Sequence, residues 1–369
     1  MNTVSSLFCG FDSLDLTQGG IARVGRLFHR ILSEPDLGLC SSVGAVVFRD
    51  TAPPKESRFT VRCASKSKLR YSMAVNAAAL RYTHFFYDFL GMGRAHCKIP
   101  GFRRPYACFV HGIEAWPGSW ARQNRIDVAR RASVLIANSQ HTINRACELD
   151  KTFERAKVTW LATEDDELPG AAASVTDAPR VLIVGRIDEG LKGHQELIHA
   201  WPTVVSAVPD AVLTIAGRGP RLSEFQKLAA DSTVASQIEF LGFVPESDMP
   251  ALWNRSSIFA MPGRGEGFGL TYIEAMRYGV PIIASIHDAG SEINVDGTTG
   301  FIVDLNRSCD LADRIIELLR DRDLAAKLGR QGQLRWQQFF RYSAFRERIV
   351  PIMRQFLDDN AASAAGNRF

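Results

Sequence analysis

The sequence predicts an α/β protein with two doubly wound, Rossmann-like domains, and three observations lead to that class. The chain has 369 residues, 46% of them hydrophobic, which suits two cores better than one. Residues 163–180 are rich in small, Pro, Gly and acidic residues without apolar periodicity, as is typical of an interdomain linker. On each side of this segment, short apolar runs alternate with helical stretches. Such alternation indicates parallel sheets covered by helices on both faces.

The domain boundaries follow from these runs. We assign residues 1–165 to a first domain, 166–179 to a linker and 180–340 to a second domain, with 341–369 as a C-terminal helix and tail. The strands expected in the first domain are VSSLFCGF, VGAVVF, YACFVHG and ASVLIAN, and GIARVGRLFHRIL is expected to be helical. The strands expected in the second domain are RVLIVGR, AVLTIAG, IEFLGF, SSIFAMP, PIIAS and GFIVD. Ligands of such sheets bind beyond the carboxyl ends of the strands, so we expect the domains to face across a cleft.

The end of the chain is expected to be an amphipathic helix followed by a tail. SAFRERIVPIMRQFL carries apolar residues at helical spacing, whereas NAASAAGNRF after it is expected to fray. The sequence leaves open whether this helix packs on the second domain or crosses back to the first.

Composition excludes several classes of protein. No apolar run approaches the roughly 18 residues of a membrane span, and the N-terminus lacks the basic flank of a signal peptide, so a cytoplasmic protein is expected. The seven cysteines are scattered and never form CxxC, which argues against a disulfide framework or a zinc site. We predict no metal and no cofactor.

The net charge of +4 conceals a local excess of positive charge. Between Lys55 and Arg104 the chain has eleven basic residues and two acidic ones. A solvated basic face explains this excess simply. The alternative is attraction to a phosphate-bearing acceptor or to an anionic membrane, which would place the protein at the inner face of the plasma membrane. No nucleic-acid motif accompanies the charge, so we expect no nucleic-acid partner.

A candidate anion site opens the second domain. In VLIVGRIDEGLKGHQELIHA a strand leads to Gly185, then to a loop with Arg186 and Lys192, and then to a helix. Two cations and free helix amides would therefore meet at the carboxyl end of a strand, an arrangement that favours a diphosphate. Either cation alone would be interpreted as an ordinary surface charge.

Two glycine pairs are weaker signals of the same kind. Gly217 and Gly219 follow a strand in LTIAGRGP, and Gly19 and Gly20 precede a helix in LTQGGIARVGRL. Glycine lets backbone approach a pyrophosphate closely, but it is also the usual residue of a tight turn.

The stretch GEGFGLTYIEAM places two carboxylates around a strand-to-helix turn. Glu266 and Glu274 flank the turn at 267–269, and the helix is expected to begin at about Thr271. Thr271 and Glu274 have the spacing of a capping box, which would stabilise the helix without any ligand. In the functional interpretation, the turn amides meet an anion, while the carboxylates accept hydrogen bonds from paired sugar hydroxyls.

Taken together, these motifs resemble a known enzyme family. GRIDEGLKGH, AGRGP, FLGFV, EGFGLTYIEAM, GVPIIAS and SEINVDGTTGFIVD follow the order and spacing of the retaining GT-B glycosyltransferase family usually numbered four, also called glycosyl transferases group 1. The resemblance covers most of residues 180–305 and includes the E-x7-E signature of that family. In the first domain it is thinner and rests on QGGIARV, FVHGIEAW and IANSQHT.

The resemblance implies a role for each matching residue. As catalytic residues it implies Arg186, Lys192, Glu266 and His111. As donor-binding residues it implies Gly20, Gly185, Gly217, Phe243, Val244, Phe268, Gly269, Leu270 and Glu274. Arg186 and Lys192 would bind the diphosphate, and Glu274 the ribose. Glu266 would bind the transferred sugar with the help of turn amides. His111 would line the reaction centre, although a histidine after an apolar strand is often just a core residue.

The activity implied is transfer of a hexose, with retention, from GDP-mannose or a UDP-sugar to a hydroxyl of a glycan or lipid-diphosphate-linked acceptor, as in bacterial polysaccharide synthesis. The N-terminal domain would bind the acceptor and the C-terminal domain the nucleotide sugar. The two cations would serve the leaving phosphate without a metal. Asp321-Arg322-Asp323 has the DxD form of a metal site, but we interpret it as helix-end charge. The alternatives are a non-catalytic scaffold of the same fold and a nucleotide-sugar epimerase. A phosphorylase is disfavoured by the chain length.

Overall fold

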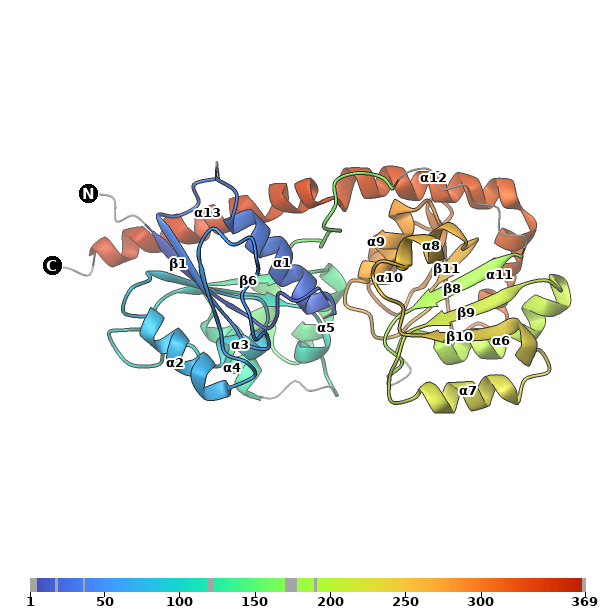
Figure 1. Ribbon diagram of the computed structural model, residues 1–369, viewed down its shortest axis with the longest axis horizontal. Helices are drawn as coiled ribbons and strands as arrows, with labels where there is room; N and C mark the ends of the chain where they lie inside the picture. The colour runs from blue at the N-terminus through green and yellow to red at the C-terminus, as the bar shows by residue number, and fades with distance from the viewer. Residues whose placement is uncertain are drawn as a thin grey trace. The chain divides into compact units, whose positions relative to one another are not determined.

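The computed structural model describes residues 5–16, 19–35, 37–118, 123–169, 178–188 and 191–366. It divides into two compact units (Figure 1). Unit 1 comprises the chain up to Glu164 together with the chain from Tyr342 onward, and unit 2 is Asp165–Arg341. Most of the predicted linker, residues 170–177, lies outside the described residues.

Unit 1 is built on a parallel sheet of seven strands in the order β3-β2-β1-β4-β5-β6-β7. The strands are β1 (Ser6–Phe11), β2 (Ser42–Val47), β3 (Thr60–Cys63), β4 (His84–Tyr87), β5 (Tyr106–Val110), β6 (Val134–Ala137) and β7 (Lys157–Val158). The α-helices are α1 (Gly20–Leu32), α2 (Lys68–Ala78), α3 (Leu90–Gly93), α4 (Gln123–Arg131), α5 (Gln140–Cys147) and α13 (Tyr342–Gly366). Short 3-10 helices lie at Ile113–Ala115 and Lys151–Arg155.

Unit 2 is built on a parallel sheet of six strands in the order β10-β9-β8-β11-β12-β13. The strands are β8 (Arg180–Val184), β9 (Val212–Ala216), β10 (Ile238–Gly242), β11 (Ile258–Ala260), β12 (Ile282–Ser285) and β13 (Gly300–Val303). The α-helices are α6 (His194–Ala207), α7 (Leu222–Ala230), α8 (Met249–Asn254), α9 (Leu270–Arg277), α10 (Gly290–Ile293), α11 (Asp310–Arg320) and α12 (Arg322–Phe339). A short 3-10 helix lies at Ala235–Gln237.

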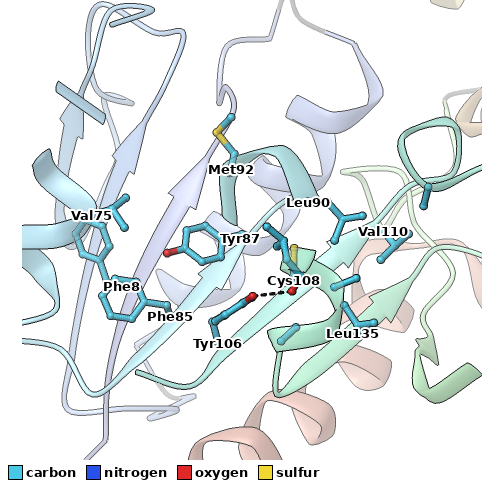
Figure 2. Packing of buried hydrophobic residues seen from close by; sticks show 14 of the residues in the cluster. Phe8, Val75, Phe85, Tyr87, Leu90, Met92, Tyr106, Cys108, Val110 and Leu135 are labelled. Carbon is cyan, nitrogen blue, oxygen red and sulfur yellow. Dashed lines mark hydrogen bonds between the residues drawn. The ribbon is translucent and has the colours of Figure 1, made fainter. Parts of the chain in front are cut away.

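Central strands of both sheets are buried along their whole length, which explains why their sequences are continuous apolar runs. In unit 1, a core of aromatic and aliphatic side chains packs on the sheet (Figure 2). Among these residues, the ring centroids of Phe8 and Phe85 are 5.6 Å apart, and the Tyr106 hydroxyl donates a hydrogen bond to the Val128 carbonyl at 2.6 Å.

The strand order places a topological switch point in each sheet. Chain order reverses between β1 and β4 in unit 1, and between β8 and β11 in unit 2. Loops that leave neighbouring strands at such a point run to opposite faces of the sheet, and the space between them is where α/β proteins bind ligands. We therefore expect a ligand-binding site at the loops after β1 and β4, or at those after β8 and β11.

The C-terminal helix packs on unit 1. The Ser5 hydroxyl donates to the Leu357 carbonyl at 3.1 Å, and the rings of His84 and Phe356 lie 5.1 Å apart. At the start of the helix, Tyr342 donates its hydroxyl to Glu34 at 2.5 Å. The helix α13 continues to Gly366, through an alanine-rich stretch with high helix propensity, and fraying of the segment from residue 360 stays a prediction. Neither α13 nor any other helix of the described residues is both long and apolar enough to span a membrane.

Candidate active site

The loops after β8 and β11 bring together two of the predicted catalytic residues. Lys192 lies just before α6, and Glu266 lies in the loop between β11 and α9. The Lys192 ammonium contacts Oε2 of Glu266 in an ion pair, and the two side chains are 23% and 18% exposed. Arg186, from the same loop as Lys192, instead binds Asp188 at 2.9 Å and is 66% exposed. Glu189 and Gly190 of this loop lie outside the described residues.

Burial and charge act in opposite directions on the Lys192–Glu266 pair. Burial by itself would lower the pKa of Lys192, but the Glu266 carboxylate more than offsets this and raises it. Burial would likewise raise the pKa of Glu266, whereas the neighbouring ammonium lowers it. Both groups therefore remain charged at neutral pH.

The turn after Glu266 also directs hydrogen-bond donors at this carboxylate. The Gly267 and Phe268 amides donate to Oε1 of Glu266, at 3.1 and 3.4 Å. Gly269 closes the turn with φ +89°, and a Cβ there would lie 2.2 Å from the Tyr272 ring. The site is thus a focus of an ammonium and backbone amides, the groups that stabilise an anion.

The structure corrects two details predicted around this turn. Helix α9 begins at Leu270 with Gly269 as its N-cap, so Thr271 lies inside the helix and the capping-box interpretation of Thr271 and Glu274 is wrong. Glu274, one turn further on, therefore lies beyond the first turn of the helix. The glycine turn replaces the side-chain cap, because Gly269 adopts the left-handed conformation that lets the chain enter the helix abruptly.

Two glycines let the site loops pack closely on one another. A Cβ on Gly185 would lie 2.7 Å from Cδ of Lys192, and a Cβ on Gly217 would lie 1.9 Å from the Gly185 carbonyl oxygen. Gly217, with φ +150°, also accepts no L side chain without strain. The loops after β8 and β9 therefore lie in direct backbone contact behind Lys192.

The remaining predicted residues of unit 2 lie around this focus rather than in it. The side chain of Phe268 is buried and packs against Phe340, so its ring is not presented to a ligand, and its amide donates to Glu266. Phe243 and Val244 follow β10, and the exposed Phe243 ring lies 5.5 Å from the Arg218 guanidinium. Leu270 is the first residue of α9.

In unit 1, His111 follows β5 and is held by its neighbours. Its Nε2 donates to the Asp88 carbonyl at 2.6 Å, which leaves Nδ1 as an acceptor in the neutral ring. Burial lowers the pKa of His111 to about 4, so the ring is uncharged at neutral pH. The His111 amide donates to Glu114, and burial raises the pKa of that carboxyl to about 7. Gly20, the other predicted residue of this unit, is the exposed first residue of α1.

Sequence reasoning missed three buried carboxyl groups at these sheet edges. Asp88 follows β4 at the switch point of unit 1, and Glu114 follows β5. Asp288 follows β12 in unit 2, and it interacts electrostatically with Lys192. Burial raises the pKa of Asp88 and of Asp288 well above the usual range. A strand assigned to 84–87 would have drawn attention to Asp88, while Asp288 stands three residues after a strand that was predicted.

Two other structural features bear on the predicted chemistry. Asp321 of the DxD-like stretch accepts a hydrogen bond from the Leu324 amide at 2.8 Å as the N-cap of α12, which confirms its interpretation as helix-end charge. Among the described residues, no three His, Cys, Asp or Glu side chains come together as metal ligands. Metal independence remains a prediction.

Solved structures with the same architecture show the fold class. HepE of Anabaena, solved with UDP-glucose, superposes with a TM-score of 0.76 at 20% identity, over 94% of this chain and 99% of that one. Sucrose-phosphate synthase of Thermosynechococcus elongatus superposes with a TM-score of 0.78 at 19% identity, over 95% and 98%. These neighbours confirm the predicted α/β GT-B fold class.

Sequence relatives then identify the family. The model of the family described as "Glycosyl transferases group 1" matches residues 164–335 of this chain. The GDP-mannose-dependent monoacylated alpha-(1-6)-phosphatidylinositol monomannoside mannosyltransferase of Corynebacterium glutamicum is 32% identical over 66% of this chain and 68% of its own length. A GDP-mannose-dependent alpha-(1-6)-phosphatidylinositol monomannoside mannosyltransferase of Mycobacterium tuberculosis is 34% identical, but over 48% of each chain. The chain belongs to the glycosyl transferases group 1 family, and it is a glycosyltransferase.

Proposed function

We propose that this glycosyltransferase moves a mannosyl residue, with retention and without a metal, from GDP-mannose to a hydroxyl of a lipid-anchored glycan or polyol. Binding of the donor is supported by one observation. The Lys192 ammonium and the amides of Gly267 and Phe268 converge on the Glu266 carboxylate at the switch point of the unit 2 sheet. The preference for GDP-mannose over UDP-sugars rests on the names of the relatives. The lipid-anchored acceptor rests on the same names, and a role in bacterial polysaccharide assembly is the wider setting proposed for it.

In the proposed reaction, the bond between the anomeric carbon and the β-phosphate oxygen breaks while a bond to the acceptor oxygen forms on the same face. The acceptor proton passes to the departing phosphate oxygen, so charge and atoms balance. Negative charge grows on the diphosphate during this step, and Lys192 and Arg186 would stabilise it as fixed cations. Glu274 would accept hydrogen bonds from the ribose, and His111 would contact the transferred sugar.

The contacts of Lys192 and Arg186 imply an exchange of partners when the donor binds. Each cation is paired with a carboxylate, Glu266 or Asp188. A diphosphate would take over the cations, which frees Glu266 to accept hydrogen bonds from hydroxyls of the sugar. Such an exchange keeps the ammonium neutralised before and after binding, and the released Glu266 carboxylate would be stabilised by hydrogen bonds from the sugar hydroxyls and from the turn amides.

Binding of the proposed donor is tested by thermal melting with GDP-mannose, UDP-glucose, UDP-N-acetylglucosamine and free GDP. A ligand that binds only the folded protein raises its melting temperature, and we expect GDP-mannose to give the largest rise. No rise with any nucleotide sugar would contradict the proposal.

The transfer half is tested with GDP-mannose and two acceptors, a phosphatidylinositol-type glycolipid and a lipid-diphosphate-linked oligosaccharide. Transfer with an α-configured product is expected in the presence of a chelator. An inverted product would overturn retention, and activity lost with the chelator and restored by manganese would overturn metal independence. A donor-induced rise in melting temperature without transfer to either acceptor would favour the non-catalytic scaffold.

A further inference from the structure

A third ionisable side chain, Asp288, lies buried next to the Lys192–Glu266 pair. It is fully buried in the loop between β12 and α10. Its Oδ1 accepts the Gly290 amide at 2.8 Å, whereas its Oδ2 makes no hydrogen bond in the part of the chain that the structure describes. The same loop holds the backbone of Glu266, because the Ala289 amide donates to the Glu266 carbonyl at 3.1 Å. A buried oxygen without a partner lowers stability, so its place beside the pair points to a role there.

Gly263 brings the Asp288 carboxyl against the loop of Lys192. A Cβ on Gly263 would lie 2.5 Å from the Leu191 carbonyl oxygen, 2.7 Å from Oδ2 of Asp288 and 3.2 Å from Cα of Lys192. Because glycine has no Cβ, no side chain separates the carboxyl from the backbone that leads to Lys192. The loop of Asp288 therefore supports the backbone of both members of the ion pair.

The site holds one ammonium and two buried carboxyl groups. Glu266 receives the Lys192 ammonium at one oxygen and two turn amides at the other, so it is the carboxyl that stays ionised. A second carboxylate would leave a buried negative charge unpaired, which favours a proton on Asp288. Burial raises the pKa of Asp288 well above its usual range, and the Gly290 amide and the Lys192 ammonium only partly offset this.

We propose that Asp288 is a positioning residue for donor binding, which in its protonated form supports the loops of Lys192 and Glu266 and leaves the ammonium free to exchange partners. The proposal rests on the proposed roles of these two residues at the donor diphosphate and sugar. A neutral Asp288 does not compete with the diphosphate for the ammonium. An ionised Asp288 would attract the ammonium and repel the diphosphate. Donor affinity should therefore fall when Asp288 loses its proton at higher pH.

The groups around Asp288 do not titrate in the same direction near neutral pH. Those that interact with it are Lys192 from the loop after β8, Glu266 from the loop after β11 and Tyr272 of α9. The pKa of Glu266 is lowered, so this group is already ionised at neutral pH. The pKa values of Lys192 and Tyr272 are raised, so both keep their protons well above neutral pH. His287, the neighbour of Asp288 in the chain, instead contacts a carboxylate that follows β13.

The test is calorimetric titration of the full chain with GDP-mannose, and with UDP-glucose in parallel, from about pH 7 to about pH 9. Above the pKa of Asp288, wild-type affinity should fall by up to about ten-fold for each pH unit, with proton uptake on binding. Asp288→Asn has the same shape and no charge, so it should bind within about three-fold of the wild type at neutral pH and lose most of the pH dependence. Asp288→Ala lacks the loop support and should bind roughly ten-fold more weakly throughout.

Thermal melting without ligand tests the proton on Asp288 separately. A carboxyl that is ionised in the unfolded chain above about pH 4, but protonated in the fold, makes stability fall as the pH rises to its folded pKa. Asp288→Asn removes this loss, so its melting temperature relative to the wild type should increase from about pH 5 to about pH 8. The control is Asp296→Asn, at an exposed carboxylate of unit 2 that accepts the Ile302 amide at 2.9 Å. It should keep the wild-type pH dependence of both measurements.

Two outcomes would overturn the proposal. One is an Asp288→Asn variant with the wild-type pH dependence of binding and melting. The other is a loss of affinity in Asp288→Asn as large as that in Asp288→Ala, because a carboxylate would then be required. If neither nucleotide sugar binds the wild type, the proposed function fails and the positioning role falls with it. A melting difference that grows with pH would in that case still show the proton on Asp288.

Discussion

Lys192 contributes to the stability of the fold and also to the proposed catalysis. Its ammonium is mostly buried and neutralised by Glu266. Removing one member of such a pair leaves the other as an uncompensated charge, while removing both does not. The same ammonium is proposed to stabilise the leaving diphosphate. A double substitution separates the two roles.

Lys192→Met is expected to lower kcat by roughly a hundred- to a thousand-fold, the usual effect of removing one donor from a developing negative charge. It should also lower the melting temperature, because Glu266 is left unpaired. Adding Glu266→Gln should restore the melting temperature, while kcat should stay low because the double variant lacks both the Lys192 ammonium and the proposed sugar contact of the Glu266 carboxylate. Melting curves and initial rates of both variants test this, with Lys227→Met on the exposed side of α7 as control. Activity that recovers together with stability would remove Lys192 from the proposed mechanism.

At the scale of elements, the site depends on the close approach of strand-to-helix loops. The segments after β8, β9 and β11 meet at backbone distance, and Gly217 contacts the Gly185 carbonyl where any side chain would collide. The sequence marked these glycines as turn residues, because glycine after an apolar strand is a local signal. It could not show that one glycine packs on another about thirty residues away.

Gly217→Ala is expected to lower the free energy of unfolding by about 3 kcal/mol or more, since its Cβ would meet backbone rather than a movable side chain. Gly297→Ala is the matched control. Gly297 also has positive φ, +66°, but nothing lies within 4 Å of its Cβ position, so its cost should be the backbone strain alone, about 1 kcal/mol. Urea unfolding of both variants measures the difference. An equal loss of unfolding free energy in the two variants would show that the loops after β8 and β9 can separate without further loss of stability.

Across the whole molecule, each unit buries a histidine in its neutral form. His84 in unit 1 and His194 in unit 2 are almost fully buried, and burial lowers the pKa of each to about 4. In the unfolded chain these rings take up protons near pH 6.5. A lowered folded pKa means that the contribution to stability is complete above pH 6.5 and is lost as the pH falls from 6.5 to 4.

We therefore expect both units to lose stability on mild acidification, by about 3 kcal/mol for each of the two histidines between pH 6.5 and pH 4. His84→Gln and His194→Gln should each make the melting temperature less sensitive to pH over this range. Thermal melting of the wild type and both variants at pH 7.5, roughly 5.5 and about 4.5 tests this. A pH profile unchanged in both variants would contradict it.

The apolar runs by themselves predicted the class of both sheets and all six strands of unit 2, because a strand covered on two faces must be apolar along its length, and that pattern is local in the chain. In unit 1 they predicted β1, β2, β5 and β6 but not β3, β4 and β7, because the edge strands β3 and β7 are short and partly exposed and β4 has only four residues. The motifs of the site, including those of Lys192 and Glu266, are also short stretches of sequence, so they could be recognised without the structure. What only the tertiary structure decided is how residues distant in sequence combine. The pairing of Lys192 with Glu266, the burial of Asp88 and Asp288 and the return of α13 to unit 1 each depend on which surfaces meet. Burial and pairing are relations between segments, and no local pattern of residues encodes them.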